Sequence, residues 1–160
     1  MFGMSSLAGR WSFVALVTSI ACIGPLVGFI WWATSPGVQG VYFAEGIFPS
    51  ETEPAGYIDA DALFAIGTAI VGCLVALLVR RRLTLTSTGL VLAALTLGGI
   101  AGSAIAVLTA YAFTSPERPK IAYGSIAEVP LTLGAAGWLL VWPIACVGTW
   151  FVADLWSSES

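Results

Sequence analysis

The sequence contains no histidine and very few charged residues. The absence of histidine removes the commonest metal ligand and the usual axial ligand of haem, so no intrinsic metal or redox centre is expected. Charged residues make up only 9% of the 160 residues, whereas hydrophobic residues make up 58%. Soluble domains carry roughly 25% charged residues. The composition therefore predicts a single membrane domain (1–160), and the six basic residues are too few for a nucleic-acid partner.

Charged residues are also absent from the interiors of the apolar segments, because all of them fall in connections, tails or helix ends. A charge within the bilayer is costly and usually marks a transport path. Its absence argues against a proton relay, an ion-coupled transporter or a voltage sensor. No carboxylate or histidine lies within a span to act as base or nucleophile, so the protein is not expected to be an enzyme.

Four apolar segments predict an all-α, polytopic integral membrane protein with four transmembrane helices. About 20 apolar residues suffice to cross the hydrocarbon core. Pro25 lies near the middle of the first segment and Pro143 near the centre of the last, and each is expected to kink its helix. The predicted spans are 11–34, 62–79, 84–113 and 131–152.

Two longer connections separate these spans, an acidic one at 35–61 and a second at 114–130. In the acidic connection, Asp59 and Asp61 stand where the second span would need an N-cap. The carboxylates could also hold a cation, but their spacing matches no EF-hand and a solvated loop is favoured. Both connections are expected to face outward.

The positive charges set the expected orientation. Arg10 and an arginine cluster at the end of the second span lie on one side, so the positive-inside rule places both termini in the cytoplasm. The cluster could also attract anionic headgroups, at about 1 kcal/mol for each basic residue. Its members are Arg80, Arg81 and Arg82.

Small residues recur along one face of the third span. A stripe of this kind lets another helix backbone approach closely, which favours helix association in lipid. It could contact another subunit or another helix of the same chain. The stripe consists of Ala94, Gly98, Gly102, Ala106 and Ala110.

Trp138 and Trp142 are four residues apart, beside Pro143, and are expected to share one face of the fourth span. Such an aromatic face could receive an isoprenoid tail, a quinone ring or another subunit, or it could pack against the small-residue stripe. No intrinsic cofactor is expected, and a lipid or quinone could bind at this surface.

Three cysteines, Cys22, Cys73 and Cys146, each fall within a predicted span. A thiol there acts as a small hydrophobe, and no C-x-x-C spacing is present. We expect packing residues, and the sequence leaves their redox state open.

The order of segments resembles a group of small actinobacterial four-helix membrane proteins of unknown function. The resemblance rests on the approach 58–64 (IDADALF), the arginine cluster, the Gly/Ala-rich third span and the final Asp154-Leu155. The Thr/Ser-rich start of the third span departs from the group, where a basic-Gly turn is expected. The resemblance implies an actinobacterial plasma membrane, but neither an established activity nor site residues.

Two functions fit these features. The first is a non-catalytic accessory subunit of a larger membrane complex, with the actinobacterial respiratory cytochrome supercomplex and the cell-envelope lipid machinery as hosts to consider. In this case the acidic connection would meet other integral membrane subunits through Glu45, Glu51 and Glu53. The alternative is a homo-oligomeric binder or facilitator for a lipid, a quinone or a small neutral solute, assembled about the stripe from Gly98 to Ala106.

Overall fold

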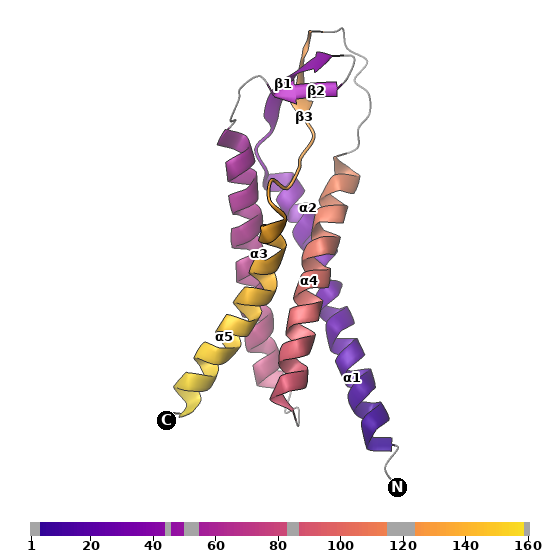
Figure 1. Ribbon diagram of the computed structural model, residues 1–160, viewed down its shortest axis with the longest axis vertical. Helices are drawn as coiled ribbons and strands as arrows, with labels where there is room; N and C mark the ends of the chain where they lie inside the picture. The colour runs from indigo at the N-terminus through magenta and orange to yellow at the C-terminus, as the bar shows by residue number, and fades with distance from the viewer. Residues whose placement is uncertain (1–3, 44–45, 50–54, 83–86, 115–123, 159–160) are drawn as a thin grey trace.

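The computed structural model describes residues 4–43, 46–49, 55–82, 87–114 and 124–158. Of these residues 78% are helical, as the sequence predicts. Long helices run along the molecule and a small sheet covers one end (Figure 1). The elements in order are α1 (Met4–Ala21), α2 (Gly24–Thr34), β1 (Val38–Phe43), β2 (Gly46–Pro49), α3 (Ala55–Arg82), α4 (Thr88–Phe113), β3 (Ile126–Val129), the 3-10 helix η1 (Ala136–Leu140) and α5 (Val141–Ser158).

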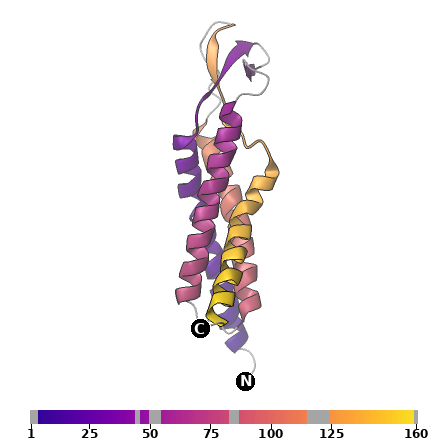
Figure 2. The same ribbon diagram turned by 90° about the vertical axis from the view of Figure 1, so that its left-hand side faces the viewer.

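Four helical segments are long and apolar enough to cross a membrane, which agrees with the predicted number of spans. Helices α1 and α2 together make the first, and η1 with α5 makes the last. Helix α1 begins and α5 ends at the end of the molecule opposite the sheet, and the bundle is slender from the side (Figure 2). The four segments are Phe13–Thr34, Gly56–Arg82, Thr88–Phe113 and Ala136–Ser157.

Both spans are interrupted close to the proline where the sequence predicts a kink, and in each span one helix ends there and another begins. The first span is broken at Cys22 and Ile23, and Pro25 lies in the first turn of α2. Pro143 likewise lies in the first turn of α5, because 131–135 is not helical and the helix begins only at Val141. The first turn of a helix has no acceptor for its amides, so a proline there loses no hydrogen bond. The prolines therefore mark where helices begin.

The acidic connection 35–61 contains regular structure that the sequence did not predict. Helix α3 begins at Ala55, so Asp59 and Asp61 lie inside it and the prediction that they cap it was wrong. Strands β1 and β2 occupy the preceding part of the connection. The fold is therefore mostly helical with a sheet, rather than all-α. The length of an apolar segment indicates only the part of a helix that crosses the bilayer. A helix such as α3 can begin before that part, so its start was not predicted.

Strand β1 is the centre of an antiparallel sheet of order β2-β1-β3. Val41 is opposite Phe48 on one side and Ile126 on the other, so these three residues share a face, as does Phe43 two residues along β1. Val38 lies on the opposite face and is buried. A Cβ atom added to Gly56 would come within 2.8 Å of Val38, so this face rests on the start of α3.

Helix α2 joins the sheet end to the bundle through close contacts on two sides. The Trp31 indole is buried and its Nε1 donates a hydrogen bond of 2.7 Å to the Ala60 carbonyl of α3. On the other side, a Cβ atom on Gly28 would collide with the Ala106 carbonyl of α4. The two backbones meet there without side chains between them.

Replacing Gly28 with alanine should destabilise the fold by about 1–3 kcal/mol, because the added methyl has no room against α4. Gly67 provides the control, since its Cβ position is open. Gly67→Ala should be neutral or stabilise by up to about 1 kcal/mol through helix propensity. Thermal unfolding in detergent, followed by circular dichroism, measures both, and equal melting temperatures would contradict the close α2–α4 contact.

Candidate functional site

The small-residue stripe of α4 is buried within the chain along its whole length. A Cβ atom on Gly98 would lie 2.9 Å from Ile20 of α1, and one on Gly102 would lie 3.1 Å from the ring of Trp142 in α5. The helices of the same chain therefore occupy this surface. Of the two contacts that the sequence left open, the structure shows the contact within the chain, in which all five residues of the stripe are buried: Ala94, Gly98, Gly102, Ala106 and Ala110.

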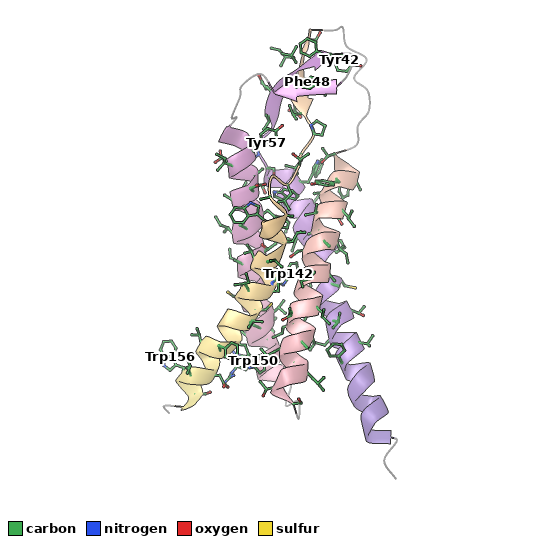
Figure 3. The ribbon with its side chains drawn as sticks, viewed as in Figure 1. Tyr42, Phe48, Tyr57, Trp142, Trp150 and Trp156 are labelled. Carbon is green, nitrogen blue, oxygen red and sulfur yellow. The ribbon has the colours of Figure 1, made fainter. Side chains whose placement is uncertain are left out.

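Trp138 and Trp142 do not form the aromatic face that the sequence suggested. Trp142 is fully buried against α4 in the middle of the bundle (Figure 3), whereas the Trp138 side chain is 37% exposed and bonds to α3. Trp138 belongs to a 3-10 helix, which has three residues per turn, so a spacing of four no longer aligns the two rings. Gly99 contacts Pro143 beside the buried ring.

Asp61 joins α3 to the segment that leads into η1. Its carboxylate oxygens accept hydrogen bonds of 3.0 Å from the Gly134 amide and from Trp138 Nε1. The neighbouring Leu133 amide donates a hydrogen bond of 3.0 Å to the hydroxyl of Tyr111 in α4. Residues 131–135 are not helical, so their amides need partners from elsewhere. Asp61 and Tyr111 supply two of them.

The three residues of the arginine cluster differ in their contacts. Arg80 forms an ion pair of 3.0 Å with Asp154 of α5, donates a 2.6 Å hydrogen bond to Ser157 Oγ, and lies 5.5 Å from the centre of the Trp150 ring. It therefore fastens the end of α3 to α5. Arg81 and Arg82 are exposed, and neither forms an ion pair within the described part of the chain.

All three cysteines carry free thiols, and two of them link α3 to α5. The buried Cys146 thiol donates a 3.3 Å hydrogen bond to the Gly72 carbonyl, and the Thr149 hydroxyl donates a 3.1 Å hydrogen bond to Cys73. Both thiols thus make packing contacts. Cys22 is exposed at the break between α1 and α2.

We call the three-stranded sheet the head. Among its described residues, the face opposite Val38 carries exposed apolar side chains. Phe43 and Phe48 are 46% and 49% exposed, with ring centres 6.0 Å apart, and Ile126 is 71% exposed. Together with Val41 they form what we call the sheet face. The sequence showed these hydrophobic residues, but their common orientation depends on pairing between β1 and a strand from the second connection.

The predicted partner-contact residues Glu45, Glu51 and Glu53 lie outside the described residues. Among the described residues, no three His, Cys, Asp or Glu side chains are grouped so as to hold a metal ion. Searches with this chain find no matching protein family, curated protein or solved structure. The exposure of Phe43, Phe48 and Ile126 on one face makes the sheet face the candidate functional site.

Removing the Asp61 carboxylate should loosen the junction between α3 and η1. Asp61→Ala leaves the Gly134 amide and Trp138 Nε1 without their acceptor, and each lost bond costs about 1 kcal/mol. Asp59→Ala removes the same charge two residues away, from an exposed side chain to which no other described residue forms a hydrogen bond. The melting temperature should fall for Asp61→Ala alone, and hydrogen exchange at Gly134 should accelerate. Equal behaviour of the two variants would show that the carboxylate does not hold the junction.

Proposed function

We propose that the protein is a non-catalytic integral-membrane accessory subunit that binds a partner through its sheet face. The observation that supports this proposal is the exposure of Phe43, Phe48 and Ile126 together on a part of the chain outside the membrane-spanning helices. Apolar side chains gathered at a water-facing surface mark protein contact sites.

The head is well suited to such a role because it is fixed to the bundle. Val38 packs onto the start of α3, and Trp31 ties α2 to the same helix. Asp61 holds the segment that follows β3. Since the surface is ordered before it meets a partner, less conformational entropy is lost on binding.

The proposed location is the cell membrane, with the arginine end in the cytoplasm and the sheet outside. The positive-inside rule supports this orientation, because Arg81 and Arg82 lie at the end opposite the sheet. The partner would then be another integral membrane subunit with an outer domain. The resemblance to actinobacterial membrane proteins described above is the reason to consider the respiratory cytochrome supercomplex as the host complex.

The alternative function, a homo-oligomeric binder of a lipid, quinone or neutral solute, has less support. Its proposed oligomer surface was the stripe from Gly98 to Ala106, which the chain itself buries. Its proposed ligand surface was the shared face of Trp138 and Trp142, which is not formed.

Placing a charge on the sheet face should release the partner. In Phe43→Glu/Phe48→Glu, two carboxylates replace the rings at the centre of the proposed contact, and loss of such central residues typically weakens binding at least tenfold. Thr132→Glu is the control, because it adds a carboxylate at an exposed position after β3. Gentle detergent extraction of tagged protein, followed by native-gel sizing and quantitative mass spectrometry, measures the partner recovered with each variant.

Circular dichroism and melting temperature establish that the double variant still folds. Recovery of the same partner in the same amount by the wild type and the double variant would overturn the sheet face as the contact. Recovery of a homo-oligomer with a defined lipid and no partner would favour the alternative function.

A further inference from the structure

Helices α3 and α5 flank an open groove near the end of the bundle where α3 ends in the arginine cluster. The two helices come close at Gly72, where an added Cβ atom would lie 2.7 Å from the Trp142 carbonyl oxygen. Beyond this point toward the arginine end, a hollow of about 460 Å³ opens between them. This volume lies within the usual range of ligand sites, about 300–1,000 Å³. Its walls include Cys73 and Leu77 from α3, and Gly148, Val152 and Trp156 from α5.

The lining of the groove suits a hydrocarbon chain. Apart from Cys73 and Thr149, the side chains that line it are apolar, and the Thr149 hydroxyl already donates its hydrogen to the Cys73 sulfur. Gly148 leaves its part of the wall open, since nothing lies within 4 Å of its Cβ position. The Trp156 indole N–H and the Cys73 thiol are the donors that remain, and the other side chains of the lining offer an acyl chain apolar contacts.

The length of the groove corresponds to one leaflet of a bilayer. It follows α5 from Ala145 to Trp156, and a helix rises 1.5 Å per residue, so this distance is about 16 Å. Half of a hydrocarbon core of about 30 Å has nearly the same depth. The headgroup of a lipid whose acyl chain lies in the groove would therefore be next to the arginine cluster.

Arginine side chains lie near the end of the groove where α3 ends. Arg81 is one helical turn beyond Leu77, on the stripe of α3 that lines the groove. Arg81 and Arg82 are exposed, and the described residues give neither an ion pair, whereas Arg80 is engaged by Asp154. Trp156, which is 76% exposed, extends from the last part of α5 (Figure 3). Tryptophan near the end of a span is typical of a membrane interface.

We propose that the groove is a binding site for one anionic phospholipid, with an acyl chain against Leu77 and Gly148 and the phosphate between Arg81 and Arg82. Arginine forms strong, charge-assisted hydrogen bonds with phosphate oxygens. A second copy of the chain in this groove would bring its own arginine cluster close to the first, and like charges would oppose that contact. The site is separate from the sheet face, so it does not depend on the proposed function.

The test uses the full-length protein reconstituted in nanodiscs that contain equal amounts of phosphatidylglycerol and phosphatidylcholine with identical acyl chains. Native mass spectrometry of the released protein counts the lipids that stay bound. The wild type should retain phosphatidylglycerol over phosphatidylcholine about tenfold or more, since each arginine near a phosphate favours the anionic lipid several-fold. Arg81→Gln/Arg82→Gln should lower this ratio to near one.

A matched pair of glycine variants tests the groove itself. Gly148→Leu should fill it and abolish retention of phosphatidylglycerol, while Gly67→Leu adds the same bulk to α3 in open space and should retain lipid as the wild type does. Circular dichroism verifies that both variants fold.

Three outcomes would overturn the site. Equal retention of the two lipids by the wild type would remove the role of the arginines, and undiminished retention by Gly148→Leu would place the lipid elsewhere. A dimer of the wild type that Gly148→Leu dissociates, without bound lipid in either, would assign the groove to a second copy of the chain.

Discussion

The close approach of neighbouring helices to the backbone of α4 is the contact on which the rest of the bundle depends. A bilayer offers no hydrophobic gain for bringing apolar helices together, so their association relies on close packing. Gly98 admits Ile20, Gly102 admits the Trp142 ring, and Gly28 of α2 meets the Ala106 carbonyl. Because α4 carries almost no side-chain bulk on this stripe, α1, α2 and α5 all reach it. The buried Trp142 then fills the space that the small residues leave.

Polar contacts place the remaining elements around this centre. At the sheet end, Trp31 and Asp61 tie α2 and η1 to α3. At the other end, Arg80 ties α3 to α5 through Asp154. These bonds lie near the ends of the spans, where both partners can be polar without exposing charge to hydrocarbon. The middle of the bundle is held by packing and its ends by hydrogen bonds and an ion pair.

The sequence predicts the spans well because their signal is local. Apolar length identifies four crossings, and periodicity identifies the stripe that becomes buried. The start of α3 at Ala55 and the sheet were missed, since a helix can extend past the bilayer and β1 pairs with a strand far along the chain. Asp61 was wrongly predicted to cap α3 because its hydrogen-bond partner, the Gly134 amide, is distant in sequence. The sheet face was not predicted for the same reason. A shared face of Trp138 and Trp142 was wrongly predicted because residue spacing does not reveal that Trp138 lies in a 3-10 helix.

Pairing of β1 with β3 also bears on how the chain is assembled. Strand β1 comes from the connection after the first span and β3 from the connection after the third, so two further spans are synthesised between them. The strands can pair only if both connections reach the same side of the membrane. A chain in which one hairpin inserts the wrong way round leaves β1 with a free edge and Asp61 apart from Gly134. Closure of the sheet therefore requires the connection after the first span and the connection after the third span to lie at the same end of the bundle.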